Sequence, residues 1–147
     1  MSKTQILCHI VFGTRLRRMT LVKEHRHELY KYIFGILDHL NCSLVRINGI
    51  EDHVHILMEL HPTQALSEVV KKVKQSSSHW IRETHVFADF DGWGSGYFAV
   101  SVSPADKESC RQYIINQAEH HRGEAYAEEL REMLARHGMQ WYEDEWG

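Results

Sequence analysis

The stretch DHVHILMEL, residues 52–60, decides the fold and carries the first candidate functional residues. A β-strand sends successive side chains to opposite faces, so His53 and His55 are expected on one face of a strand. The apolar residues that alternate with them are expected to point into a core: Val54, Ile56, Met58 and Leu60. Two imidazoles on one face can chelate a cation. Because the chain has 12 histidines in 147 residues, a chance pair of surface histidines is the open alternative.

The segments around this strand follow the order β-α-β-β-α-β and then two more helices. Strands are expected at 5–12, 42–50, 52–60 and 97–103, and helices at 23–40, from 63 onward, at 104–121 and at 124–137. Four residues mark expected boundaries: Thr63 and Ser103 as helix N-caps, Gly123 as a hinge and Gly138 as a C-cap. This order predicts an α+β, ferredoxin-like antiparallel sheet with its first two helices on one face. The other face is expected to be free for a site or a partner.

Length and composition predict one globular domain over residues 1–147, with 43% apolar residues, two prolines and a net charge of −3. The sequence contains neither a run of about 18 apolar residues nor a signal-peptide core, so a cytoplasmic protein without a membrane span is expected. The cysteines Cys8, Cys42 and Cys110 are widely spaced and suggest neither a disulfide framework nor a zinc site.

A tyrosine and a glutamine occur at helical spacing in the helix expected after Ser103. Tyr113 and Gln117 are four residues apart and therefore share a helix face. With His53 and His55, the hard carbonyl oxygen of Gln117 would complete a three-ligand site that suits Mg²⁺ or Mn²⁺. Tyr113 would then stand one turn from the metal and could attack a phosphorus bound there. The alternative is an ordinary amphipathic helix with a packed tyrosine.

Three stretches carry a family resemblance in this order: DHVHILMEL (52–60), GWGSGYFAVSVS (92–103) and YIINQAEHH (113–121). They resemble the single-tyrosine HUH transposases of the small insertion-sequence and repeat-associated type. The segment HIVFGTRLRR (9–18) resembles the first strand and basic turn of that family, and the resemblance covers about residues 5 to 140.

The resemblance implies a specific activity. His53 and His55 would bind a divalent metal, Gln117 would complete the site, and Tyr113 would attack a phosphate in single-stranded DNA. The products would be a 5′-phosphotyrosine bond and a free 3′-OH. The resemblance also implies a homodimer, in which the tyrosine helix can complete the partner's metal site, and recognition of short DNA hairpins at element ends.

Basic residues form two clusters that could contact DNA phosphates. They are Arg15, Arg17 and Arg18 after the first strand, and Lys71, Lys72 and Lys74 on the second helix. His120 and His121 also match the family pattern and could contact phosphate or support the metal ligands. The alternative for every one of these residues is a solvated surface position.

Two other functions are compatible with the same residues. A domesticated relative would act on chromosomal repeat hairpins instead of its own element, and only the flanking DNA would distinguish it. A non-catalytic ferredoxin-like RNA-binding module would place aromatic residues on the outward sheet face. Here that face of the third strand is expected to carry His53, His55, Leu57 and Glu59, which disfavours the RNA-binding alternative.

Overall fold

The computed structural model describes residues 1–120 and 125–140. Its elements follow the expected order: β1 (Leu7–Gly13), η1 (Arg15–Arg17), α1 (Lys23–His39), β2 (Ser43–Gly49), β3 (His53–Glu59), α2 (Leu66–Thr84), β4 (Phe98–Val102), η2 (Pro104–Asp106), α3 (Lys107–Ile115), α4 (Gln117–His120) and α5 (Tyr126–Arg136). Among the described helices, none combines the length and apolar content needed to cross a membrane.

The four strands form one antiparallel sheet in the order β2-β3-β1-β4. The two central strands pair so that Val11 lies opposite His55 and Gly13 lies opposite His53. This is the ferredoxin-like order predicted from the sequence, and it places the histidine pair in the centre of the sheet, away from its edges.

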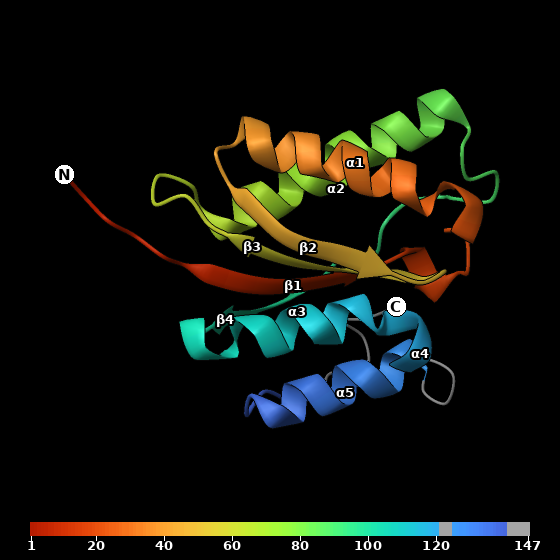
Figure 1. The fold of residues 1–147 in the computed structure, drawn as a ribbon. Coiled ribbons are helices and arrows are strands. Elements are labelled where there is room, and N and C mark those ends of the chain that lie inside the picture. The colour runs from red at the N-terminus through yellow and green to blue at the C-terminus, as the bar shows by residue number, and fades with distance from the viewer. Residues whose placement is uncertain (121–124, 141–147) are drawn as a thin grey trace.

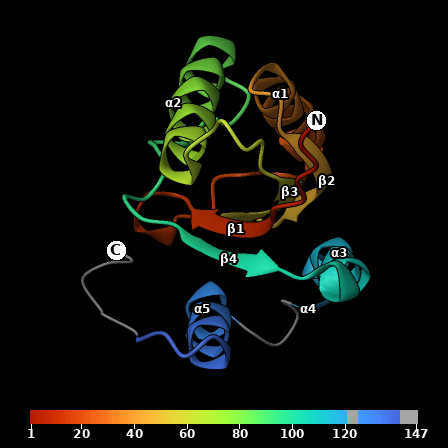
Figure 2. The same ribbon diagram turned by 90° about the vertical axis from the view of Figure 1, so that its left-hand side faces the viewer.

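The first face of the sheet is covered by α1 and α2, as predicted (Figures 1 and 2). Val54, Ile56 and Met58 of β3 belong to the main core, and each is at most 1% exposed. Apolar residues at helical spacing on the two covering helices pack against these strand residues. They are Leu29, Ile33 and Leu37 of α1, and Val69, Val70, Val73 and Ile81 of α2. The alternation expected in DHVHILMEL is therefore confirmed on its core side.

The second face of the sheet is covered by α3, α4 and α5, which lie below the strands in Figure 1. A second apolar cluster joins Val11 and Phe98 of the sheet to one stripe of α5: Tyr126, Leu130, Met133 and Leu134. This face was expected to be free. It is covered because the apolar stripe of α5 is buried against it, and the site therefore lies between the sheet and these helices.

The helix expected over 104–121 is interrupted. Ser103 caps its start as predicted, since its hydroxyl oxygen accepts a hydrogen bond from the Asp106 amide at 3.2 Å. The helix then breaks at Asn116, where φ is −91° and ψ is 21°. The Asn48 side-chain amide of β2 donates to the carbonyls of Ile114 and Ile115 at 3.1 Å. This side chain satisfies carbonyls that the break would otherwise leave without partners.

Three other expected boundaries had different outcomes. Thr63 is not an N-cap, because α2 begins three residues later at Leu66 and the Thr63 hydroxyl instead lies 2.6 Å from Nδ1 of His61. Gly138 follows α5 with a left-handed φ of +69°, as predicted for a helix terminus. Gly123, the expected hinge, lies outside the described residues.

Candidate metal and nucleophile site

His53 and His55 lie on the side of β3 that faces α5, and both side chains are completely buried. Their Nδ1 atoms have partners in the protein. Asp52 Oδ1 lies 2.8 Å from Nδ1 of His53, and Nε2 of His9 lies 2.9 Å from Nδ1 of His55. Partners of this kind fix the tautomer and the ring orientation of a metal-binding histidine. Both rings are therefore held with Nε2 toward the same point.

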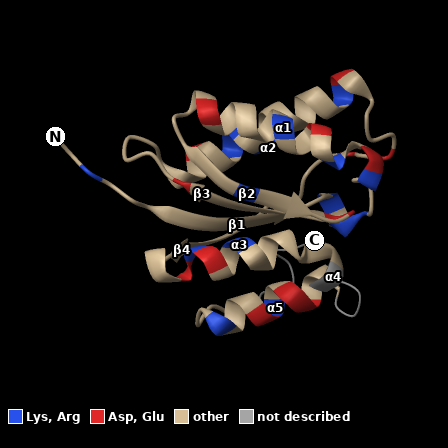
Figure 3. Ribbon diagram, viewed as in Figure 1, with Lys and Arg blue, Asp and Glu red and all other residues tan. Residues whose placement is uncertain are grey.

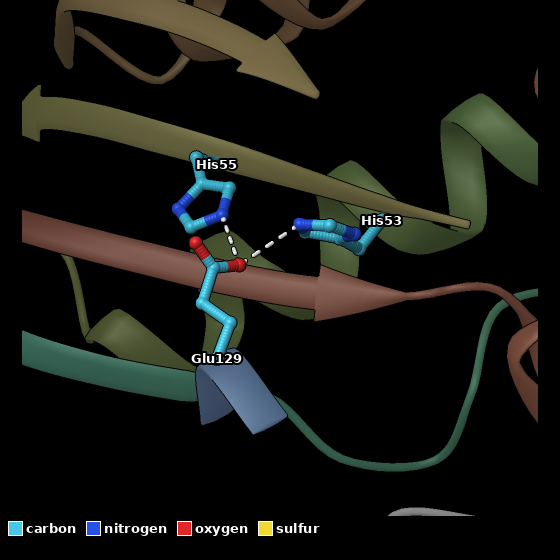
Figure 4. A group of neighbouring side chains, drawn as sticks. All are labelled: His53, His55 and Glu129. Carbon is cyan, nitrogen blue, oxygen red and sulfur yellow. Dashed lines mark hydrogen bonds and ion pairs between the residues drawn. The ribbon is translucent and has the colours of Figure 1, made fainter. Parts of the chain in front are cut away.

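That point is occupied by the carboxylate of Glu129 from α5 (Figure 4). Its Oε1 lies 3.1 Å from Nε2 of His53 and 3.1 Å from Nε2 of His55. Ligand atoms of the three residues all lie within 4.8 Å of one another. Two imidazole nitrogens and a carboxylate oxygen are donors that divalent cations accept, so the buried group fits a metal ion.

Gln117 and Tyr113 reach the same cluster. Oε1 of Gln117 lies 3.3 Å from Nε2 of His53, and its amide nitrogen donates to Oε2 of Glu129 at 3.3 Å. The phenol of Tyr113 donates a hydrogen bond to Oε2 of Glu129. The structure thus brings together all four residues that the sequence singled out for metal binding and nucleophilic attack, and it does so within one chain.

Burial and charge shift the titration of this cluster. Burial, followed by the neighbouring His55, lowers the pKa of His9 to about 3, so His9 is neutral. Burial alone would lower the pKa of His53, but hydrogen bonds to Asp52 and Glu129 outweigh it and raise that pKa. Burial and then the negative charge of Glu129 raise the pKa of Tyr113 well above its ordinary value. The phenol is therefore protonated at neutral pH.

Tyr126 closes the cluster from the side of α5. Its ring stacks on His53 with centroids 4.0 Å apart and an angle of 8° between planes. Burial, followed by the charge of Asp52, raises the pKa of the Tyr126 phenol above its ordinary value. Tyr126 therefore acts here as a neutral packing residue that holds α5 against the histidine pair.

The arginine cluster expected to bind DNA lies in the turn after β1, near the site. Arg15 and Arg18 are exposed, and Arg17 is half-exposed. The backbone amide of Thr14, which begins this turn, donates to the carbonyl of Asp52 at 2.9 Å. Arg18 forms an ion pair with Asp91.

The lysine cluster lies on α2, across the sheet from the histidines. Lys71 and Lys72 are exposed. Lys74 is half-buried, and its amine donates to the carbonyls of Gly94 and Gly96 at 2.9 and 2.7 Å. Burial lowers the pKa of Lys74 to about 8. In this structure the Lys74 amine holds the loop before β4.

Charged residues are mixed over the layer of α1 and α2, whereas α5 carries mainly acidic ones (Figure 3). His120 ends α4, and His121 lies outside the described residues, so the roles expected for these two side chains remain predictions.

Sequence reasoning missed Glu129 and His9. Glu129 was not singled out, but its helix position gives a signal. It lies in phase with Tyr126, Leu130, Met133 and Leu134, so a carboxylate interrupts an otherwise apolar stripe. His9 lies in β1, where the alternation of Cys8, Ile10 and Phe12 places it on the same sheet face as His55.

Comparison with known proteins gives the family. A family model described as "Transposase IS200 like" matches residues 2–117, which are 116 of the 147 residues and end at Gln117, before α5. The transposase for insertion sequence element IS200 of Salmonella typhimurium is 25% identical over 116 residues, covering 76% of each chain. The ISDra2 transposase TnpA of Deinococcus radiodurans is 24% identical over 118 residues, covering 77% of this chain and 84% of the relative.

Two solved structures share the fold. A crystal structure of a Deinococcus radiodurans protein assigned as a transposase has a TM-score of 0.62 and 23% identity, covering 79% of this chain and 93% of that one. A REP-associated tyrosine transposase bound to a REP hairpin has a TM-score of 0.62 and 16% identity, covering 82% and 75%. The family model spans β1 to Gln117 and so includes the histidine pair and Tyr113. On this match, the chain belongs to the IS200-like transposase family.

Proposed function

We propose that this transposase is a metal-dependent enzyme that cleaves and rejoins single-stranded DNA with Tyr113 as its nucleophile. One observation carries the proposal. The phenol of Tyr113 is hydrogen-bonded to the carboxylate that lies 3.1 Å from Nε2 of both His53 and His55. A nucleophile beside a candidate metal cluster suits metal-assisted phosphoryl transfer.

The phenolic oxygen of Tyr113 attacks a phosphorus of the DNA backbone. A bond forms between that oxygen and phosphorus, and the bond from phosphorus to the 3′ oxygen breaks. The products are a 5′-phosphotyrosine and a free 3′-OH. The phenolic proton passes to Glu129, its hydrogen-bond acceptor, and the leaving oxygen takes a proton from solvent. Because the phosphotyrosine conserves the bond energy, attack by a 3′-OH can rejoin strands without ATP.

His53, His55 and Glu129 would hold a divalent metal, with Gln117 as the additional oxygen ligand expected from the sequence. When bound, the ion supplies positive charge that stabilises the phosphate as negative charge develops on it. Asp52 and His9 keep the two imidazoles in the tautomer that leaves Nε2 available. Mg²⁺ and Mn²⁺ are the ions proposed.

DNA with hairpins is the proposed substrate. The structural relative bound to a REP hairpin supports this choice. The exposed arginines of the turn after β1 and the exposed lysines of α2 are proposed to contact phosphates outside the site. The proposed homodimer is tested by light scattering at micromolar concentration, where a strict monomer would contradict it.

Covalent trapping tests the proposed function. The protein is incubated with labelled single-stranded hairpins from the DNA that flanks its gene, with Mg²⁺ or Mn²⁺, and adducts are resolved on a denaturing gel. Wild type and Tyr32→Phe, which changes a tyrosine on α1, should form the adduct, and Tyr113→Phe should not. Metal chelation or His53→Ala/His55→Ala should abolish it. An adduct formed by Tyr113→Phe would exclude Tyr113 as the nucleophile. An adduct formed by wild type in the presence of a chelator would exclude a requirement for the metal.

A further inference from the structure

A cleft of about 340 Å³ lies beside the nucleophile, between β4, α3 and α5. Apolar side chains form part of its wall, among them Val100, Val102 and Met133, and the exposed Ser109 also lines it. This volume lies within the range of small-ligand pockets, roughly 300–1,000 Å³. The cleft is therefore large enough to hold a small ligand. None of the candidate metal ligands lines it.

Tyr113 and His9 connect the cleft to the metal cluster. Both side chains line the cleft, while the Tyr113 phenol contacts Glu129 and Nε2 of His9 contacts His55. The residues of the cluster have no comparable access, because His53, His55, Gln117 and Glu129 are each at most 1% exposed. A phosphate that reaches Tyr113 must therefore belong to a strand that passes through or beside the cleft.

A positive charge faces the nucleophile from α5. Arg136 is exposed and lines the cleft. Tyr113 lines the same cleft, so the guanidinium and the phenol border one shared space. No carboxylate of a described residue forms an ion pair with Arg136. Asp106 lines the cleft as well, and its charge would repel a phosphate placed at the η2 end.

We propose that this cleft holds the nucleotide next to the scissile phosphate and that Arg136 binds the phosphodiester there. This inference rests on the proposed function and adds a substrate subsite to it. Arginine is suited to phosphate because its guanidinium presents a planar set of donors. The ring of Tyr113, with the apolar wall, offers a surface on which an unpaired base can stack. The substrate class is single-stranded nucleic acid.

Salt dependence of binding tests the role of Arg136. The probe is a fluorescein-labelled DNA hairpin with an unpaired tail of randomised sequence, bound to Tyr113→Phe protein so that no cleavage occurs. Loss of one phosphate contact to a single strand should reduce the slope of log K against log salt by about 0.7. Tyr113→Phe/Arg136→Gln should show this reduction and a weaker affinity. Tyr113→Phe/Arg82→Gln, altered at an exposed arginine of α2, should match the parent.

A second variant tests the cleft itself. Ser109→Trp should fill it and weaken binding of the unpaired tail, whereas Ser67→Trp, at an exposed serine on α2, should not. Equal melting temperatures would show that each variant is folded. An unchanged salt slope in the Arg136 variant, or full affinity in Ser109→Trp, would overturn the inference. If wild-type protein forms the covalent DNA adduct in the trapping experiment, either of these two results refutes the subsite alone. If wild-type protein forms no adduct, the proposed function itself is refuted.

Discussion

Tyr113 donates a hydrogen bond to Glu129, and this carboxylate also lies 3.1 Å from Nε2 of both His53 and His55. The contact joins two parts of the chain that are 16 residues apart, one on α3 and one on α5. It has two opposing effects. It orients the phenol toward the candidate metal cluster. It also keeps the phenol protonated, because the negative charge of Glu129 raises the pKa of Tyr113, second only to burial. Neutralising Glu129 would remove part of that shift.

Glu129→Gln should weaken Mn²⁺ binding by at least about tenfold, because the substitution removes the single carboxylate of the His-His-Glu group but preserves its shape. The affinity is measured by titration calorimetry at neutral pH on protein stripped of metal. Glu128→Gln, altered at the exposed neighbouring residue of α5, is the matched control and should bind as wild type does.

Gln117→Ala distinguishes the two candidate oxygen ligands in the same titration. If Glu129 is the principal oxygen ligand, Gln117→Ala should lose less affinity than Glu129→Gln, because a neutral carbonyl contributes no net charge. The reverse order would assign the third position to Gln117, as the sequence first suggested.

His9 should make stability depend on pH in the metal-free protein. Its pKa is about 3 in the folded state and near 6.5 when unfolded, so between these values the unfolded chain binds a proton that the folded protein does not. The stabilisation is complete above pH 6.5 and is lost as the pH falls. Between about pH 6 and about pH 5, wild type should therefore lose up to about 1.4 kcal/mol more unfolding free energy than His9→Gln.

Urea unfolding in the presence of a chelator measures this difference at each pH. The comparison uses slopes, so a constant destabilisation by His9→Gln does not affect it. His79→Gln, altered at an exposed histidine of α2, should retain the wild-type slope. Parallel pH profiles for wild type and His9→Gln would contradict the prediction.

The strand pattern of residues 52–60 was sufficient to predict the core side of the fold, because a period of two allows only one set of side chains to face α1 and α2. The helix break at Asn116 was not predictable in this way. The break is capped by Asn48 of β2, which lies 66 residues from Ile114 in the sequence and meets the end of α3 through tertiary packing. Local periodicity contains no information about such a partner.

The site shows the same limit. His53 and His55 could be paired from strand geometry, and Tyr113 and Gln117 from helix spacing. Glu129 belongs to a third element, and its closeness to the histidines depends on how α5 packs on the sheet. Its position in an apolar helix stripe marks it as unusual, but the partner it meets is set by tertiary contacts such as the stacking of Tyr126 on His53.

Gly13 should be intolerant of a side chain because α5 packs directly on it. A Cβ added to Gly13 would lie 2.6 Å from Cε2 of Tyr126, whose ring stacks on His53. Gly13→Ala should therefore lower the unfolding free energy by about 1–3 kcal/mol. Gly35→Ala is the matched control, because a Cβ added there would meet no atom within 4 Å. The substitution also replaces a glycine in the interior of α1 with a better helix former. It should be neutral or stabilising by up to about 1 kcal/mol.

Combining Gly13→Ala with Tyr126→Leu tests whether the ring is the cause. If the clash with Tyr126 produces the loss, the double variant should be more stable than the sum of the two single effects predicts. Strict additivity in chemical denaturation would place the cause elsewhere, for example at the Asp52 carbonyl, which lies 3.1 Å from the same added Cβ.

The three lysines predicted to bind DNA should separate into two classes. Lys74 is half-buried and donates to the carbonyls of Gly94 and Gly96, so Lys74→Met should cost about 1.5–3 kcal/mol of unfolding free energy. Lys71→Met and Lys72→Met change exposed positions and should alter stability by no more than about 0.5 kcal/mol. If Lys71 and Lys72 bind phosphates, each of their substitutions should also weaken binding of the DNA hairpin and reduce the salt dependence of that binding. Urea unfolding and fluorescence anisotropy on the same three variants make the comparison. A Lys74→Met protein with wild-type stability and weakened DNA binding would show that its amine leaves the loop to bind DNA.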